Sequence, residues 1–438
     1  MSSGETESVM RPDAGPVAIV LAAGEGSRMN SARSKLLHTI GGHSLLHLVC
    51  DAVGVLQPSQ MVVVVGYQSE QVGAHATEVA PACKLVIQTN LDGPVSAVRA
   101  GLSALTAVDE RAEVVVVFGD LPLLGGVTLQ AMAAAHRRDN DDATVLASSG
   151  RLLVHTAGDE VPEDVPPSAD AGVYVFDYGS LVAGLAEADD TLVEMSGLVA
   201  LAKSEDGHIG TFLTDDPWQT CGVDDRVQLA RLSAEFNRRQ VNRWMRAGVT
   251  VIDPNSTWIE ADVDLAPDVT LWPGTMLLGA TSVAQGATIG PETTVKDSEV
   301  GAGATIKRSH VELAVVGDGV SVGPYARLRP GTQIGDGGVV GTFVETKNIQ
   351  LGAKARIGHL TYCGDATLGD EVDIGAGVVF ANWDATNRAR TEVGASAIIG
   401  AGSLIVPPAE VPEGGVVQPG SLVRGTSENA KRGLKEDT

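Results

Sequence analysis

Short apolar runs alternate with helix-length segments through the first half of the chain. The runs are PVAIVLAAG, QMVVVVGY, ACKLVIQT and AEVVVVFGD, and SLLHLVCDAVGVL is one of the segments between them. Apolar runs bounded by glycine and separated by helices indicate βαβ units, with a parallel sheet covered on both faces. We therefore predict a doubly wound α/β domain, nucleotidyltransferase-like in its loops, over residues 16–226.

A segment with a helical period and many arginines follows this domain. In QLARLSAEFNRRQVNRWMRAG the apolar residues recur at the spacing of one helix face. We predict a linker helix over residues 227–249.

Beyond the linker the period changes to six residues. Valine, threonine or alanine recurs at every sixth position, and leucine, isoleucine or valine recurs two positions later. The first column is Val263, Val269, Thr275, Thr281, Ala287 and Thr293, and the second is Leu265, Leu271, Leu277, Val283, Ile289 and Val295. This period, with glycine-rich corners such as VDIGAG, is typical of hexapeptide repeats. We expect a left-handed parallel β-helix over residues 250–424, with both columns facing inward.

The amino-acid composition limits which binding partners and which cellular compartment we expect for this protein. The formal net charge is −24, which argues against nucleic acid or anionic membrane as a partner, because these need clustered basic residues. No run of about 18 apolar residues suggests a membrane span. The 4 cysteines form no CxxC pair, so neither a zinc site nor a disulfide framework is indicated. We expect a cytoplasmic protein with a disordered leader at residues 1–15 and a polar tail at 425–438.

The stretch LAAGEGSRMNSARSKLLH, residues 21–38, has the glycine pattern of a phosphate-binding loop. Its backbone N–H groups would cradle a triphosphate, and Arg28 would stabilise charge that develops in phosphoryl transfer. The loop and the turn at Asp120 both follow predicted strands. Ligands of doubly wound sheets bind at this end of the strands.

The coil carries the strings GPYARLRPGT, GTFVETKN, GHLTYCGDA, VDIGAG and ANWDATNR. Together with the phosphate loop and the arginine-rich helix, they make residues 16–425 resemble the bacterial N-acetylglucosamine-1-phosphate uridyltransferase/glucosamine-1-phosphate acetyltransferase family. The resemblance implies an acetyltransferase coil that uses acetyl-CoA, a first domain that binds Mg²⁺, and a homotrimer with acyl-CoA sites between adjacent coils.

For the coil, the resemblance implies that His359 is the general base and Glu345 its acidic partner. An imidazole can take the proton of an amine that attacks a thioester. Arg329 and Lys347 match residues that bind the acceptor's phosphate, and the alternative reading of both is a surface ion pair. The other implied acceptor-binding residues are Tyr362, Asp373, Asn382 and Arg388.

Several positions depart from the family pattern. Asp373 replaces an asparagine and Arg388 a lysine. The implied acyl-CoA-binding residues are Ala376, Ala401 and Pro419. Ala401 stands where the family often has a serine, and Trp383 replaces a tyrosine. Asp373 is either a tolerated exchange or the mark of a different acceptor, so both the acyl group and the acceptor stay open.

The first domain matches the family better at its phosphate site than elsewhere. The implied nucleotide-site residues are Gly24, Gly26, Arg28, Lys35, Gln88 and Gly93, and the implied metal ligands are Asp120 and Asp224. The alternative for Asp120 is a cap on a turn. Ser34 replaces a proline, and we expect this to weaken the turn that aims Lys35.

The nucleobase and sugar contacts of the family are missing. In LDGPVSA, Leu91 lacks the amide that would bind uracil, and Pro94 replaces a threonine. The sugar-binding segment is shortened, and its asparagine aligns with Asp170. We therefore expect the first domain to be a degenerate uridyltransferase.

The sequence thus predicts a CoA-dependent N-acyltransferase that acts on a small anionic amine. Two alternatives stay open, a fully bifunctional enzyme and a non-catalytic structural paralogue. Retention of the set His359, Glu345, Arg329 and Lys347 argues against the paralogue.

Overall fold

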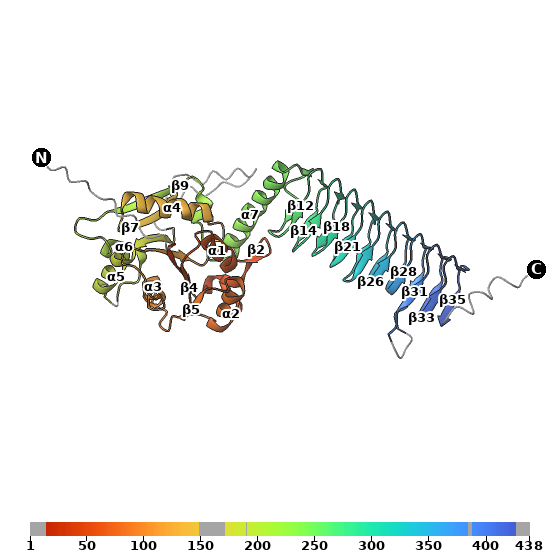
Figure 1. Cartoon of the computed structure of the whole chain (residues 1–438), viewed down its shortest axis with the longest axis horizontal. Helices are drawn as coiled ribbons and strands as arrows, with labels where there is room; N and C mark the ends of the chain where they lie inside the picture. Colours follow the sequence, from red (N-terminus) through yellow and green to blue (C-terminus); the bar gives the residue numbers. More distant parts are fainter. Residues whose placement is uncertain (1–14, 149–170, 190, 384–387, 426–438) are drawn as a thin grey trace, which may run out of the picture. The chain divides into compact units, whose positions relative to one another are not determined.

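The structure, a computed structural model, describes residues 15–148, 171–189, 191–383 and 388–425 (Figure 1). Its contacts divide the chain into two units, Met1–Ala234 and Glu235–Thr438. Residues 1–14 of the expected leader, residues 426–438 of the expected tail and Asp170 lie outside the described residues.

The first unit is built on a seven-stranded sheet with the order β5-β4-β1-β6-β8-β7-β9. The strands in that order are β5 (Lys84–Ile87), β4 (Gln60–Val65), β1 (Val17–Ala22), β6 (Glu113–Phe118), β8 (Val173–Asp177), β7 (Ala143–Ser148) and β9 (Ile209–Thr214). Strand β8 runs antiparallel to β6 and β7, and the other described pairs are parallel. The expected α/β domain is confirmed, and the antiparallel strand β8 is its departure from the predicted parallel sheet.

Helices cover both faces of this sheet. They are α1 (Leu45–Gly54), α2 (Ser69–Val79), α3 (Pro94–Ser103), α4 (Gly126–Asp139), α5 (Tyr178–Glu187) and α6 (Met195–Leu201). Successive residues of a strand point to opposite faces. Thus Val63 packs with α1, α2 and α4, whereas Val62 and Val64 pack with α3, α5 and α6. The continuous valine runs are explained by burial on both sides.

Short elements complete the unit at the ends of the strands. They are the 3-10 helices η1 (Ser27–Met29), η2 (Lys35–Leu37) and η3 (Pro217–Thr220) and the small hairpin β2 (Thr39–Ile40) and β3 (His43–Ser44). The first two belong to the predicted phosphate loop.

Helix α7 (Arg226–Arg246) leads into the coil. Asn237 of this helix is buried, and its Nδ2 donates to the Thr257 carbonyl at 2.8 Å while its Oδ1 accepts from the Ile259 N–H at 2.9 Å. One buried side chain therefore satisfies two buried backbone groups at the edge of the first coil turn.

The second unit is a coil of short parallel strands, a left-handed β-helix with three faces. The first face is one sheet, made of β10 (Thr250–Val251), β13 (Thr270–Leu271), β16 (Thr288–Ile289), β19 (Thr305–Ile306), β22 (Ser321–Val322), β25 (Val339–Val340), β27 (Arg356–Ile357), β29 (Asp373–Ile374), β32 (Ile398–Ile399) and β34 (Val416–Val417).

The other two faces share longer strands and form one connected sheet. The second face holds β11 (Trp258–Ile259), β14 (Met276–Leu278), β17 (Thr294–Lys296), β20 (His310–Glu312), β23 (Arg327–Leu328), β30 (Val379–Phe380) and β35 (Leu422–Gly425). The third face holds β12 (Asp264–Leu265), β15 (Ser282–Val283), β18 (Glu299–Val300), β21 (Ala314–Val316), β24 (Thr332–Ile334) and β31 (Thr391–Val393). Strands β26 (Glu345–Leu351), β28 (Tyr362–Leu368) and β33 (Leu404–Val411) run across both.

Both predicted columns face the interior of the coil. Every member of the two columns is at most 5% exposed. The threonines among them keep their hydroxyls bonded, as Thr275 donates to the Trp272 carbonyl at 2.6 Å. The six-residue period is therefore confirmed as the period of the faces.

Candidate active sites of the two units

Four of the implied acceptor-binding and catalytic residues gather on the second face of the coil. Glu345 and Lys347 flank Thr346 in β26, and Thr346 is buried, so both neighbours point outward. Tyr362 pairs with Glu345 in the register of β26 and β28. Arg329 follows β23, and its Nη1 donates to Glu345 Oε1 at 2.9 Å.

The tyrosine of this group is held in a defined place. A Cβ at Gly364 would lie 2.6 Å from the Tyr362 hydroxyl oxygen, so the ring position needs the glycine. Burial raises the pKa of Tyr362, and the nearby Arg329 opposes the rise. The phenol therefore stays protonated at neutral pH and can donate a hydrogen bond.

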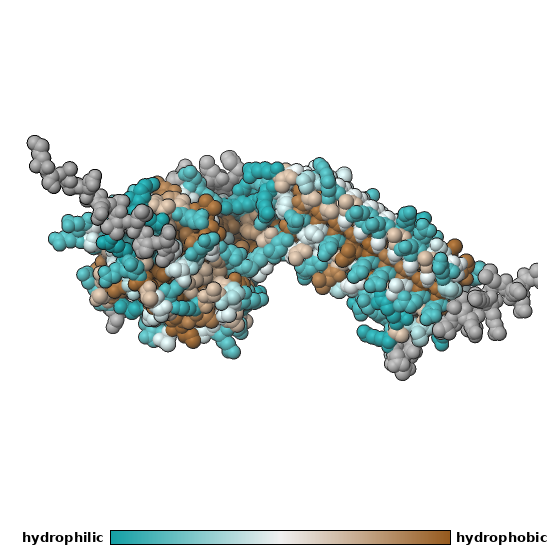
Figure 2. Space-filling view, viewed as in Figure 1, coloured by the Kyte–Doolittle hydropathy of each residue, from teal (hydrophilic) through white to brown (hydrophobic). Residues whose placement is uncertain are grey.

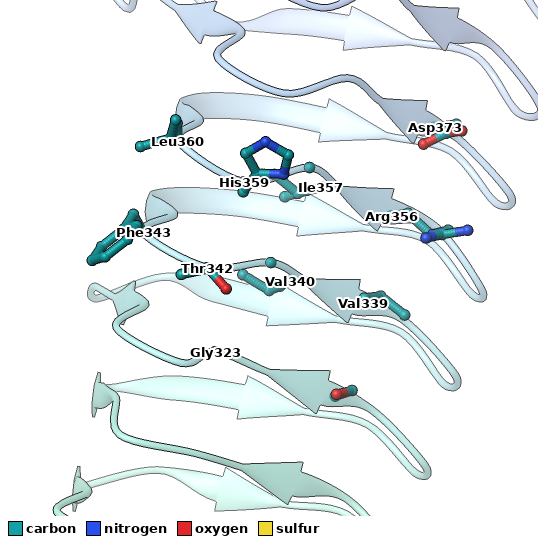
Figure 3. A pocket seen from close by; sticks show the side chains of 13 residues that line it. Gly323, Val339, Val340, Thr342, Phe343, Arg356, Ile357, His359, Leu360 and Asp373 are labelled. Atoms are coloured by element: carbon teal, nitrogen blue, oxygen red, sulfur yellow. The ribbon is translucent and has the colours of Figure 1, made fainter.

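His359 comes at the end of the first face, where the chain bends into the second at Leu360. It lines a cavity of about 490 Å³ together with Asp373 and Arg356. Figure 3 shows the imidazole projecting from the bend, with Arg356 on the strand that leads into it and Asp373 on the next strand. The cavity thus joins the predicted base to one predicted acceptor-binding residue.

The three implied acyl-CoA positions continue the row that His359 begins. The backbone carbonyls of His359, Ala376 and Ala401 accept from Gly377, Gly402 and Gly420 at 2.8–2.9 Å, which places these residues on successive turns of the coil. Pro419 precedes Gly420 on the last of these turns. A row of small residues, half-buried at Ala376 and exposed at Ala401 and Pro419, therefore runs along the coil from the predicted base.

Glu345 has a different contact from the expected one. In a single chain its carboxylate accepts from Arg329, and none of the hydrogen bonds among the described residues joins it to His359. Its role as the orienting partner of His359 stays a prediction.

Sequence reasoning missed a group of polar residues at the corner between the second and third faces. Asp365 accepts hydrogen bonds from Asn348 and from the predicted acceptor-binding residue Asn382. Arg388 lies across from Trp383 in a short backbone bridge, and both are exposed. The signal that could have found this corner is the aspartate after glycine in YCGDA, since Asp365 adopts a positive φ of 48°.

In the first unit, four of the implied charged residues form one cluster. The Lys35 ammonium contacts the carboxylates of Asp120 and Asp224, lying 3.3 Å from Asp224 Oδ1. The Arg28 guanidinium lies 2.8 Å from the same oxygen. Gly26 allows this arrangement, because a Cβ there would lie 2.8 Å from the Lys35 Cβ.

Oxygen ligands from two carboxylates suit Mg²⁺. Asp120 and Asp224 are close enough to share one cation, since both contact Lys35. The residues present therefore fit a metal ion, provided that the Lys35 ammonium moves aside.

The turn before Lys35 is supported in a way that the sequence did not suggest. Ser34 has φ −53°, a value that proline also adopts. Its N–H donates to Gln68 Oε1 at 2.9 Å, and Gln68 Nε2 donates to the Ala32 carbonyl at 2.7 Å. The glutamine thus ties the two sides of the turn together in place of a rigid ring.

The expected nucleobase site is occupied by internal contacts. Gln88 is buried, and its Nε2 donates to the Gly93 carbonyl at 3.1 Å and to Ser96 Oγ at 2.5 Å. A Cβ at Gly66 would lie 2.6 Å from Leu91 Cδ2 and 2.9 Å from the Ala23 Cβ, so the Leu91 side chain lies beside the start of the phosphate loop. Pro94 is the first residue of α3, a position that suits proline.

The two units together define a nucleotidyltransferase-like domain joined to a hexapeptide-repeat transferase coil. Residues 18–205 match the family described as the MobA-like NTP transferase domain. The chain is 42% identical over 426 residues to the bifunctional protein GlmU of Kineococcus radiotolerans, covering 93% of this chain and 87% of that protein. It is 45% identical over 388 residues to the bifunctional protein GlmU of Cutibacterium acnes, covering 82% of this chain and 91% of that protein.

The chain therefore belongs to the bifunctional GlmU family. Membership confirms the predicted resemblance and the prediction that the chain is an enzyme with N-acyltransferase activity. It stands against the alternative of a non-catalytic paralogue. Among the described residues, no helix is long and apolar enough to cross a membrane.

Proposed function

We propose that the coil transfers the acetyl group of acetyl-CoA to the amine of a small anionic acceptor, an amino sugar phosphate with glucosamine 1-phosphate as the first candidate. The observation that carries this proposal is the row of small residues that starts at His359 and ends at Pro419. A narrow acyl-CoA chain can lie along such a row and bring its thioester to the imidazole.

The proposed reaction needs one base and a fixed amine. The amine nitrogen attacks the thioester carbonyl and forms the C–N bond while the C–S bond breaks. His359 takes the proton that the amine loses and returns it to the departing thiolate. The cavity at His359 gives the acceptor room beside the base.

The anion of the acceptor would bind at Arg329 and Lys347. Arginine offers a fork of donors and lysine a point charge, and both groups point outward from the second face. Arg329 is shared with Glu345 in the free chain, so the bound phosphate would replace a surface ion pair that contributes little by itself.

We further propose that the working unit is a cytoplasmic homotrimer with acyl-CoA sites between coils. Figure 2 shows apolar surface along the coil. Exposed apolar residues form a row at the corner between the first and second faces, where the rings of Tyr325 and Phe343 stack at 5.2 Å and Leu360 follows on the next turn. A row of exposed apolar side chains is suited to contact with another chain.

For the first unit we propose a uridyltransferase that is weak or inactive. Support comes from Gln88, whose amide donates to Gly93 and to Ser96 of α3, and from Leu91, which brings an apolar side chain to the phosphate loop.

A second candidate is the fully bifunctional enzyme, and the intact cluster of Arg28, Lys35, Asp120 and Asp224 favours it. That cluster supplies the charges which phosphoryl transfer requires, and Mg²⁺ bound by Asp120 and Asp224 would neutralise the charge of the triphosphate.

Thiol release from acetyl-CoA, measured over a panel of amines with glucosamine 1-phosphate first, tests the coil's function. Saturable release with an anionic amino sugar is expected. If no amine of the panel releases thiol from purified protein, the proposed acyl transfer is wrong.

A further inference from the structure

Asp365 joins three successive turns of the coil at one corner. Its Oδ1 accepts from Asn348 Nδ2 at 2.6 Å, and its Oδ2 accepts from Asn382 Nδ2 at 2.7 Å. Both asparagines come from neighbouring turns, so the carboxylate lies between two side-chain amides.

The chemistry of the carboxylate fixes the orientation of both amides. Burial alone would raise the pKa of Asp365, but the hydrogen bonds from Asn348 and Asn382 and the charges of Lys347 and Arg390 lower it overall. The group is therefore ionised at neutral pH, and an ionised carboxylate only accepts. Each amide must turn its NH₂ end toward Asp365, which leaves its oxygen at the opposite end.

Asn382 lies beside the acceptor-binding face. It follows β30, whose Val379 pairs with Tyr362, and Asp365 itself is three residues beyond Tyr362 in β28. With its NH₂ end bonded to Asp365, the Asn382 amide has its oxygen turned away from that carboxylate, and an amide oxygen can accept but not donate.

Arg390 donates three further hydrogen bonds at the same corner. Its Nη2 donates to the Ala366 carbonyl at 2.9 Å, its Nε to Thr367 Oγ1 at 2.8 Å and its Nη1 to the Asn348 carbonyl at 3.3 Å. Asn382 comes directly before the exposed Trp383, and Arg390 lies two residues after the exposed Arg388.

We propose that Asp365 is a positioning residue of the acceptor site, holding the Asn382 amide so that its oxygen accepts a hydrogen bond from a hydroxyl or amine of the acceptor. The inference rests on the proposed acyl transfer. It also predicts substrate specificity: the Asn382 oxygen favours an acceptor substrate that places a hydroxyl or amine group beside it.

The test is Asp365→Asn, which keeps the size of the side chain. The substituted side chain has a single oxygen for two donors, so either Asn348 or Asn382 loses its bond or turns round. The KM for the acceptor should rise about 10-fold, the effect of one misdirected hydrogen bond, while the KM for acetyl-CoA and the melting temperature stay unchanged.

A double variant that restores the acceptor KM distinguishes a positioning role of Asp365 from a general loss of structure. Asn382→Asp alone should raise the acceptor KM, because two carboxylates would face each other. In the double variant, Asp365→Asn combined with Asn382→Asp, the new amide can donate its NH₂ to the new carboxylate while its oxygen accepts from Asn348, so the acceptor KM should recover. Asp370→Asn is the matched control, since Asp370 accepts the Ala353 N–H at an exposed position of the next corner.

An unchanged acceptor KM in Asp365→Ala, which removes both acceptor oxygens, or a double variant no better than Asn382→Asp alone, would overturn the inference while leaving acyl transfer by the wild-type enzyme in place. A wild-type enzyme that acetylates no amine would instead overturn the proposed function and this inference with it.

Discussion

The two units carry their functional side chains on different kinds of backbone. In the coil these side chains occupy outward positions that alternate with buried ones, as Glu345 and Lys347 do around Thr346. In the first unit they depend on loops at the ends of strands, where the Gln88 amide donates to the Gly93 carbonyl and to Ser96 of α3. An outward position can change without disturbing a core, and it is also kept in register by that core. A site built on loops is lost when the loops close or shorten.

The largest expected effect separates the base from the scaffold of the coil. His359→Ala should lower acyl transfer by about 10²–10⁴-fold, because general-base assistance is lost while the inward columns are untouched. Steady-state thiol release and the melting temperature are the measurements. His310→Ala, at another exposed histidine of the coil, is the control and should keep its activity. Near-normal turnover of folded His359→Ala would remove this residue from the mechanism.

The next experiment tests whether the first unit is less active than the coil. With Mg²⁺, UTP and N-acetylglucosamine 1-phosphate, pyrophosphate release should be slower than acetyl transfer by about 10²-fold or more, because misplacement of the reacting groups costs this much. Asp120→Ala shows whether any residual rate depends on the metal site. Efficient formation of UDP-N-acetylglucosamine that disappears in Asp120→Ala would mean that both units are catalytic.

A smaller effect should distinguish the anion site from ordinary surface charge. Arg329→Ala and Lys347→Ala should each raise the acceptor KM about 10-fold with little change in kcat, since a charge-assisted hydrogen bond to the bound anion is lost. Lys354→Ala, at an exposed lysine of another corner, is the control. Unchanged kinetics in both variants would show that the residues form only surface ion pairs.

The sequence was sufficient to predict which residues are buried where a short period repeats. The six-residue step placed Thr275 and Leu277 in the interior, because each turn of the coil repeats the geometry of the last. It could not show that Arg329 engages Glu345 or that Asp365 lies between two amides. Those contacts depend on side-chain directions across turns, which periodicity does not encode.

In the first unit, too, the sequence could not show which side chains meet, and there the contacting residues are farther apart in the chain. The glycines of the phosphate loop were readable, but the meeting of Lys35 with Asp120 and Asp224 spans 85 and 189 residues. The antiparallel strand β8 was also missed, because a buried apolar run has the same appearance in either direction.

The smallest expected effect concerns Ser34→Pro, which restores the proline of the family pattern. Ser34 already has a proline-like φ of −53°, so the ring fits. The variant loses the N–H bond to Gln68, about 0.5–1.5 kcal/mol, and gains about 0.4–1 kcal/mol from a stiffer unfolded chain. It also removes a buried hydroxyl that has no partner among the described residues. The free energy of unfolding should therefore change by less than about 1 kcal/mol, and pyrophosphate release should not improve, because Gln88 and Leu91 are unaffected.

Chemical denaturation measures the free energy of unfolding of Ser34→Pro, and the UTP assay measures its pyrophosphate release. Gln68→Ala is the comparison variant, because it loses the same hydrogen bond without gaining the proline ring. A large gain in UDP-N-acetylglucosamine formation by Ser34→Pro would place the defect of the first unit in its phosphate loop instead of its nucleobase site.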